Sequence, residues 1–274
     1  MKKKYKKIYI EIINYCNLSC PFCVKTTREK RKMTKDEFSH VLDEIKPYTD
    51  YIYLHVQGEP LMHPEIKDFL NIAKDKGFYV NLTTNATLLD RNIDLLIESE
   101  AVRQINLSLQ ALTILPDKEK YYDNIIKLIN KNKNIYISLR LWGDFNPTEI
   151  KKELSYFEER LGIELNLRET NRLKERLYVS LEDKFTWPDL NNPFNSENGR
   201  CEAVHQMAIL SNGEVVPCCL DKDGIMTMGN IFKTPFKDII SDLRYQNMIN
   251  GFKKGIICEE LCKHCTFLDR FNKK

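Results

Sequence analysis

The segment EIINYCNLSCPFC, residues 11–23, places three cysteines directly after a short apolar run. They are Cys16, Cys20 and Cys23, in the spacing C-x3-C-x2-C. Three thiols are one short of a closed four-ligand metal site, and an odd number cannot be paired completely in disulfides. Soft thiolates this close together suit zinc or an iron–sulfur cluster.

A structural zinc ion would need a fourth ligand nearby. The next candidates, His40 and His55, lack the spacing of a zinc finger. On a cubane of four irons, by contrast, three thiolates leave one iron without a protein ligand. Such an open iron is a place where a substrate can bind and be activated.

The composition is that of a folded protein without a strong electrostatic bias. At 274 residues, of which 42% are apolar, the chain is long enough for one domain of moderate size plus an appendage. Its 42 basic and 39 acidic residues give a net charge of +3, so nothing calls for a polyanionic partner. The lysine-rich start MKKKYKK is expected to be a solvated terminus.

No segment has the character of a signal peptide or a membrane span. Glu11 and Asn14 interrupt the first apolar run before it reaches the roughly 7–15 residues of a signal-peptide core. No window approaches the ~18 apolar residues of a transmembrane helix. We therefore expect a soluble, cytoplasmic protein with no membrane partner.

The nine cysteines fall into two groups. Three lie near the N-terminus, none lies between Cys23 and Cys201, and the other six lie from Cys201 onward. In a reducing cytosol, cysteines at tight spacings are more often metal ligands or catalysts than disulfide partners. This partition is the main feature of the sequence's organisation.

Strand and helix patterns alternate over the first part of the chain. Segments rich in Ile, Val, Tyr and Leu, several nearly apolar as if both sheet faces were covered, predict strands at 7–13, 51–57, 77–84, 104–110, 134–141 and 162–167. Helical patterns lie between them at 34–48, 64–77, 87–99, 117–132 and 146–162. Thr34, with Glu37 three residues later, predicts a capping box at the first helix.

This alternation predicts an α/β fold with a parallel sheet and right-handed crossovers. Six units are fewer than the eight that close a TIM barrel, so we expect a partial (β/α)6 TIM-like barrel over residues 1–170. Sites in such folds lie at the C-terminal ends of the strands. The segment after the first strand, with its three cysteines, lies at such an end.

The pattern changes after about residue 170. Residues 171–199, rich in Pro, Asn, Asp and Ser, predict a linker or loop. Residues 206–219 predict a β-hairpin with Asn212-Gly213 at its turn, and 234–252 predict a helix. Residues 200–274 are therefore expected to form a small, cysteine-bearing second domain.

The stretch CNLSCPFC resembles the signature of the radical S-adenosylmethionine (SAM) superfamily. In that family the three cysteines hold a 4Fe–4S cluster, and the amino and carboxylate groups of SAM chelate its open iron. The resemblance implies that Cys16, Cys20 and Cys23 are cluster ligands and that Phe22 lies by the adenine. It also implies reductive cleavage of SAM to a 5′-deoxyadenosyl radical, which removes a hydrogen atom from the substrate.

Four further strand ends resemble the family's cofactor-binding positions. The GEP-type motif, whose backbone holds the SAM amino group, corresponds to Gly58, Glu59 and Pro60. TTNATLL resembles the family's TNG-x-L segment and makes Asn85 a candidate, although Ala86 replaces the usual glycine. The positions that contact the SAM ribose and carboxylate correspond to Ser108 and Arg140. Singly, these residues could equally be ordinary turn, strand-end or surface residues.

The C-terminal cysteines resemble the SPASM domain, an auxiliary-cluster module of many radical SAM enzymes. Cys201, Gly213 and Cys218 match its opening C-x9–15-G-x4-C, and Cys262 and Cys265 form a closing C-x2-C. The chain lacks the middle cysteine run of the full form, so the shortened "twitch" form with one auxiliary 4Fe–4S cluster fits better. The implied ligands are Cys201, Cys218, Cys262 and Cys265; a zinc-ribbon-like module is the alternative.

Cys219 and Cys258 are spare in this assignment. A spare thiol is usually a small buried hydrophobic group. Cys219 could instead replace Cys218 as a ligand, or act as a hydrogen-atom donor, as in radical epimerases. It is therefore the one catalytic candidate outside the ligand sets.

The resemblance implies a radical SAM enzyme of the oxidoreductase type. A fully ligated auxiliary cluster suits electron acceptance, hence oxidation or cross-linking of a peptide or small molecule, with an external flavodoxin- or ferredoxin-type electron donor. About six residues precede the first strand, so no N-terminal leader-recognition domain is expected. The alternatives are a radical epimerase, a nucleic-acid-modifying radical enzyme, or a non-enzymatic zinc or iron–sulfur scaffold. The sequence identifies neither the substrate, nor a general base, nor the oligomeric state.

Overall fold

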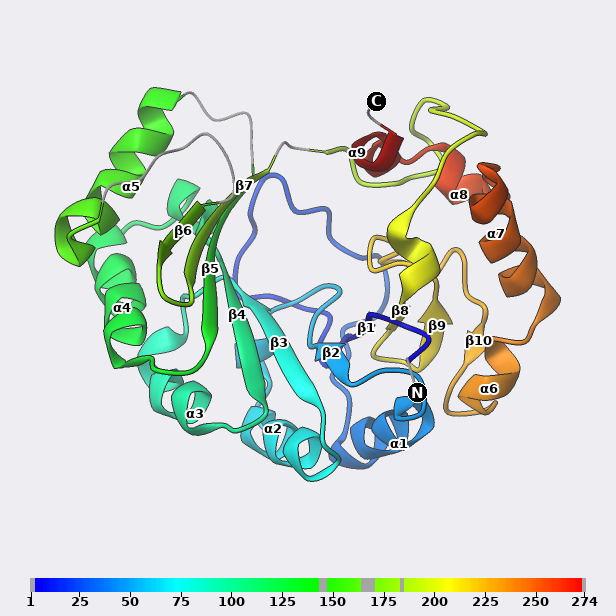
Figure 1. Ribbon diagram of the computed structural model, residues 1–274, viewed down its shortest axis with the longest axis horizontal. Coiled ribbons are helices and arrows are strands. Elements are labelled where there is room, and N and C mark those ends of the chain that lie inside the picture. The colour runs from blue at the N-terminus through cyan, green and yellow to red at the C-terminus, as the bar shows by residue number, and fades with distance from the viewer. Residues whose placement is uncertain (1–2, 143–146, 164–170, 183–184, 273–274) are drawn as a thin grey trace.

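The computed structural model describes residues 3–142, 147–163, 171–182 and 185–272. One ten-stranded sheet runs through it in the order β10-β9-β8-β1-β2-β3-β4-β5-β7-β6, and the sheet does not close on itself (Figure 1). The strands are β1 Lys7–Ile10, β2 Tyr51–Tyr53, β3 Tyr79–Thr84, β4 Val102–Ser108, β5 Tyr136–Trp142, β6 Asn171–Lys174, β7 Leu177–Glu182, β8 Gln206–Ile209, β9 Glu214–Val216 and β10 Gly229–Asn230.

The first five helices along the chain cover the outer side of this curved sheet (Figure 1). The last four follow β10 and lie on the side of β8 to β10. The helices are α1 Lys35–Ile45, α2 Ile66–Asp75, α3 Ile93–Glu98, α4 Lys118–Lys131, α5 Pro147–Leu161, α6 Phe236–Ile239, α7 Leu243–Lys254, α8 Glu260–Lys263 and α9 Asp269–Asn272. The capping box at α1 is confirmed, with Thr34 and Glu37 bonded reciprocally. No helix of the described residues is long and apolar enough to span a bilayer.

The expected open barrel is confirmed: β1, β2, β3, β4, β5 and β7 are parallel neighbours. The sixth strand differs from the sequence prediction. The predicted strand at 162–167 falls largely outside the described residues, whereas β7 pairs in parallel with β5 and forms a hairpin with β6. Both β6 and β7 lie in the span predicted as linker, because the Pro- and Asn-rich residues 186–199 that follow them dominate its composition.

The inner face of the half-barrel carries several polar side chains, which corrects the expectation of strands apolar on both faces. On β2, Ile52 is fully buried toward the helices, whereas Tyr53 faces the cavity on the inner side. Thr83 and Arg140 line the same cavity from β3 and β5. A closed barrel fills its interior with packed branched residues. This open one keeps polar groups there, available to a ligand.

The second domain continues the sheet of the first. β8 pairs in parallel with β1 along its whole length, and β9 returns antiparallel to β8 through the predicted turn at Gly213. The predicted single helix at 234–252 is instead two helices, α6 and α7. Asp242 separates them because its side chain accepts a hydrogen bond from Arg244 N and caps α7.

Glu11 joins three parts of the chain at the end of β1. Its buried carboxylate accepts two hydrogen bonds from Arg28, of 2.6 and 2.8 Å, on the segment that follows the cysteine loop. It also accepts bonds from Ser211 N and Oγ in the β8–β9 turn, and from Gln57 N after β2. One carboxylate therefore fixes the cysteine loop, the second strand end and the second domain together.

Glu11→Gln is expected to lower the free energy of unfolding by about 3–5 kcal/mol, because it leaves the guanidinium of Arg28 partly buried without its anion. The matched control is Asp94→Asn, which removes an exposed carboxylate paired with Lys131 and should change stability little. Urea unfolding of the two variants measures the difference. Equal stability losses would contradict the role assigned to Glu11.

Candidate active site

The cysteine loop leaves β1 at the C-terminal end of the barrel strands, as expected. Cys16 and Cys23 are exposed and Cys20 is half-buried. The loop returns through a bridge between Ile13 and Lys32, so both of its ends are anchored. The three thiols are therefore held on one short loop and remain accessible.

Gly58 supports this loop through its backbone. Its φ is +79°, and a Cβ added there would lie 2.3 Å from Ile13 O and 2.8 Å from Tyr15 O. The next residue, Glu59, donates its N–H to Tyr15 O at 3.1 Å. Only glycine permits this close approach, one residue before Cys16.

The Glu59 side chain links the GEP segment to the end of β3. Its buried carboxylate accepts hydrogen bonds from Leu61 N (3.0 Å), Thr84 Oγ1 (2.7 Å) and Asn85 N (2.7 Å). Burial raises the pKa of Glu59 from 4.5 to about 7, and these hydrogen bonds oppose that shift. Gly58, Glu59 and Pro60 thus brace the loop and are not among the residues lining the large cavity described below.

Asn85 contacts the first thiol. Its Nδ2 donates to Cys16 Sγ at 3.4 Å and to Asn17 Oδ1 at 2.9 Å. Ala86, which replaces the family's glycine, takes a left-handed conformation with φ of 64°. The backbone therefore keeps a shape that glycine adopts readily, despite the substitution.

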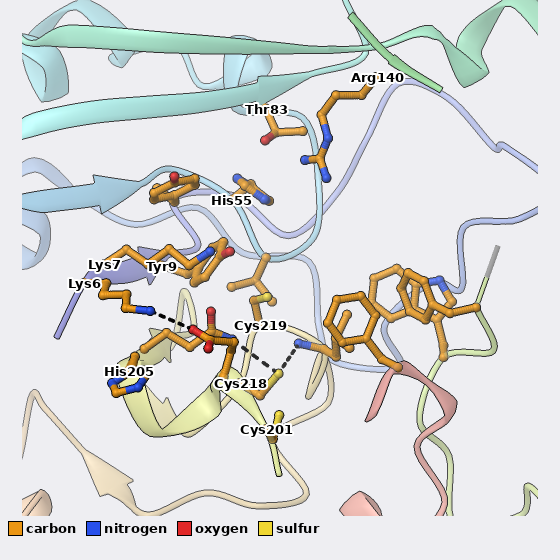
Figure 2. Close-up of a pocket in the computed structure, with 18 of the residues that line it drawn as sticks. Lys6, Lys7, Tyr9, His55, Thr83, Arg140, Cys201, His205, Cys218 and Cys219 are labelled. Carbon is orange, nitrogen blue, oxygen red and sulfur yellow. Dashed lines mark hydrogen bonds and ion pairs between the residues drawn. The ribbon is translucent and has the colours of Figure 1, made fainter. Parts of the chain in front are cut away.

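A cavity of about 610 Å³ lies on the inner face of the half-barrel, beside the second domain (Figure 2). Phe22, Ser108 and Arg140 all line it. Ser108 and Arg140 are direct neighbours in the β4–β5 register. The structure thus brings three predicted SAM-binding residues to one space.

The structure sorts the six C-terminal cysteines by location. The four predicted auxiliary ligands, Cys201, Cys218, Cys262 and Cys265, together line a second, smaller cavity with an otherwise mostly apolar wall. Cys201 and Cys218 line the large cavity as well, whereas Cys219 lines only the large cavity. Cys258 lines neither cavity and packs against α7, where its Sγ contacts Asn247 O at 3.6 Å.

Polar contacts fix the segments that carry the second cysteine group. Asp221, just after Cys219, accepts hydrogen bonds from Ile225 N and Met226 N and holds that loop. Arg244 on α7 makes a two-bond pair with Glu259, which immediately precedes α8 and Cys262. These contacts position the cysteines from different elements around one cavity.

The donor chemistry fits iron–sulfur clusters. Partial desolvation of its thiol, followed by the neighbouring Cys20 and Cys16, raises the pKa of Cys23 to about 11. Thiols that resist ionisation together are deprotonated when they coordinate a metal, because the metal supplies the missing positive charge. Within the described part of the chain, no three Cys, His, Asp or Glu side chains converge on a single-ion site.

Sequence reasoning missed the inner-face residues near the second domain. Lys7 and Tyr9 of β1 line the large cavity (Figure 2), and so does Tyr53 of β2. His55, just after β2, is a substrate-pocket candidate that the sequence does suggest, and it lines the same cavity. The signal was the alternation in KIYI and YIYLH, in which every second side chain is polar or aromatic. It was obscured because Tyr and Ile both count as strand formers.

Two family models match the chain. One, described as the radical SAM superfamily, matches residues 10–140, and the other, described as the iron–sulfur cluster-binding SPASM domain, matches residues 201–266. The chain therefore belongs to the radical SAM superfamily and carries a C-terminal SPASM domain. Its cofactors are accordingly SAM and two 4Fe–4S clusters.

One curated relative is the tungsten-containing aldehyde ferredoxin oxidoreductase cofactor-modifying protein of Pyrococcus furiosus. It is 28% identical over 158 residues, which are 56% of this chain and 40% of that protein. The chain thus matches less than half of that relative's length.

Two solved structures show the same fold. BtrN in complex with AdoMet and 2-DOIA is 16% identical, with a TM-score of 0.65 covering 97% of this chain and 94% of that one. The anSMEcpe structure with bound AdoMet and Cp18Cys peptide is 15% identical, with a TM-score of 0.66 covering 98% and 90%. These neighbours establish the architecture.

Gly58→Ala is expected to destabilise the fold by more than about 2 kcal/mol and to lower the iron content, because the new Cβ displaces the backbone before Cys16. Gly255→Ala is the matched control: its φ is +78° and nothing lies within 4 Å of its added Cβ. The free energy of unfolding of that variant should fall by only about 1–2 kcal/mol, which is the cost of a left-handed conformation for a residue with a Cβ. Thermal unfolding and iron analysis distinguish them; equal effects would contradict the bracing role.

Glu59 should make stability depend on pH. The folded chain keeps a proton on Glu59 up to a pKa of about 7, whereas the unfolded chain releases it near the usual 4.5. The contribution is therefore complete below about pH 4.5 and is lost as pH rises through about 7, a fall of about 3 kcal/mol. Urea unfolding from about pH 5 to about pH 8 should show this slope in the wild type and a flatter one in Glu59→Gln. Identical slopes would contradict the assignment.

Proposed function

We propose that this chain is a radical SAM enzyme that oxidises or cross-links its substrate, with the auxiliary cluster as electron acceptor. The substrate and SAM share the large cavity. Two ligand sets are assigned. The SAM-binding cluster is held by Cys16, Cys20 and Cys23, and the auxiliary cluster by Cys201, Cys218, Cys262 and Cys265.

The observation that carries this proposal is the separation of the cysteines. Four thiols from three different segments line one cavity, which supports a closed set of four cluster ligands. The N-terminal loop, by contrast, presents three thiols near the end of the large cavity where Phe22 lies. A closed set suits electron transfer, and an incomplete set suits a cluster that binds SAM.

When bound, the cofactors supply reductive cleavage of SAM, removal of a substrate hydrogen atom by the 5′-deoxyadenosyl radical, and an acceptor for the remaining electron. The chain's own residues bind SAM and orient it. Phe22 offers an aromatic face to the adenine, and Ser108 and Arg140 offer a hydroxyl and a cation to the ribose and carboxylate of SAM. Asn85 holds Cys16 in place through its amide.

The substrate class is open between a peptide and a small molecule. A neighbour in fold is described with the peptide Cp18Cys and another with 2-DOIA, so the architecture accommodates both kinds of ligand. The cavity of about 610 Å³ is of the size that holds small molecules. An external electron donor of the flavodoxin or ferredoxin type would deliver the first electron.

Cysteine variants test the assignment after anaerobic reconstitution. The wild type is expected to hold about eight irons per chain and to release 5′-deoxyadenosine with dithionite. Replacing Cys16, Cys20 and Cys23 by Ala should remove about four irons and abolish that release. Cys262→Ser with Cys265→Ser should also remove about four irons but retain SAM cleavage.

Cys258→Ser is the matched control, because Cys258 lines neither cavity, and it should lose no iron. Zinc in place of iron, with no SAM cleavage, would overturn the proposed function. Loss of SAM cleavage only in the Cys262 and Cys265 variant would contradict the division of roles.

A second candidate function, radical epimerisation, is favoured by the position of Cys219. Its thiol lines the large cavity, and Cys219 packs against the small apolar cluster that contains Tyr9. A thiol there can return a hydrogen atom to a substrate radical from the face opposite the SAM-binding side. The thiyl radical left on Cys219 would be restored to the thiol by one solvent proton and one electron from the auxiliary cluster, which the external electron donor would resupply. The substrate would then be inverted rather than oxidised.

Cys219→Ala is expected to retain about eight irons per chain, because Cys219 is not among the residues lining the second cavity. Loss of about four irons would make Cys219 a ligand and remove it as a donor. With a substrate that turns over, epimerisation in D2O places one solvent deuterium in the product and requires Cys219. Oxidation places no solvent deuterium in the product and does not require Cys219.

A further inference from the structure

The inner part of the large cavity carries an excess of positive charge. Lys7 and Arg140 line it from β1 and β5, and among the described lining residues the only carboxylate is Glu202. Glu202 is already paired with Lys6 at 3.0 Å, where both side chains are at least half exposed. The charge of the Lys6–Glu202 pair cancels, so no carboxylate of the described lining is left for Lys7.

Lys7 lies in an aromatic cradle. Its Nζ is 5.1 Å from the ring centroid of Tyr9 and 5.1 Å from that of Tyr53. The two rings contact each other, with centroids 5.0 Å apart. Ring faces partly replace the water that a buried ammonium loses. They hold the ammonium in one place at the cavity wall.

Among the described residues, no carboxylate forms an ion pair with Lys7, whereas the neighbouring Lys6 pairs with Glu202. Burial is the first cause that lowers the pKa of Lys7 and Arg140 adds to it, while Cys219, Cys218 and Glu202 oppose the shift. Burying a charge costs free energy unless an opposite charge accompanies it. An anion in the cavity would remove that cost.

His55 adds a polar group at the same wall. Its ring lies 5.2 Å from that of Tyr9, edge to face, and its Nδ1 is buried with no hydrogen-bond partner in the described structure. Burial, with Arg140 and Lys7 nearby, lowers its pKa to about 3, so the imidazole is neutral. A neutral imidazole offers one N–H donor to a ligand.

We propose that Lys7 binds an oxyanion of the substrate, a carboxylate or a phosphate, with Tyr9, Tyr53 and His55 around it. The inference rests on the proposed function, in which Arg140 serves the SAM carboxylate and leaves Lys7 for the substrate. The substrate is then an acidic molecule, and its anionic group lies at the end of the cavity nearest Cys219. Lys7 is a specificity-determining residue in this account.

Saturation-transfer NMR on the reconstituted, SAM-loaded protein tests this directly. The probes are acetate and methyl phosphate, each with an uncharged counterpart, acetamide and trimethyl phosphate. We expect saturation of one or both anions and not of the uncharged probes. Acetate alone would indicate a carboxylate substrate, and methyl phosphate alone a phosphorylated one.

The variants Lys7→Gln and Lys7→Met should reduce the anion signal at least about fivefold, and two replacements guard against one that does not fold. Lys7→Arg keeps the positive charge and should retain the anion signal. Lys6→Gln is the matched control, since it removes a neighbouring lysine of the same charge, and should also retain it. No anion signal in the wild type, or equal signals in Lys6→Gln and Lys7→Gln, would overturn the inference.

Release of 5′-deoxyadenosine from the same wild-type sample separates the two claims. SAM cleavage without anion binding overturns the role of Lys7 and leaves the proposed function intact. Absence of SAM cleavage in a fully reconstituted sample defeats the proposed function, whatever the anion probes show.

Discussion

The buried carboxylate of Glu11 is the constraint on which the site depends. It lies where β1 ends, and its partners belong to the cysteine loop, the second strand end and the β8–β9 turn. Removing a carboxylate from water is costly, so it persists only where several donors satisfy it. Because these donors come from both domains, the cysteine loop and the SPASM domain are positioned by the same group.

The two cysteine groups illustrate how ligand number decides chemistry. The loop after β1 offers three accessible thiols braced by Gly58 and Asn85, while the second domain gathers four around an apolar cavity. The large cavity lies beside both groups, with Phe22 and Cys219 among its lining residues. In the proposed function, a substrate held there lies between the cluster that starts radical chemistry and the one that ends it.

The sequence predicted the parallel open sheet, the cysteine loop and the hairpin at Gly213, because strand–helix alternation and cysteine spacing are local signals. It did not predict β7, since Pro- and Asn-rich neighbours masked a short strand. It also missed the polar inner face, where Lys7 and Tyr9 alternate with Ile8 and Ile10. The joining of β8 to β1 and the bonds of Glu11 are long-range pairings that no local pattern encodes.

The central claim is that the three-cysteine cluster, and not the auxiliary one, binds SAM. Electron–nuclear double resonance on the dithionite-reduced protein, with SAM labelled by 17O in its carboxylate, measures this directly. A 17O coupling is expected in the wild type and in the Cys262→Ser, Cys265→Ser variant, but not when Cys16, Cys20 and Cys23 are replaced. No coupling in the wild type, or coupling that survives loss of those three thiols, would contradict the account.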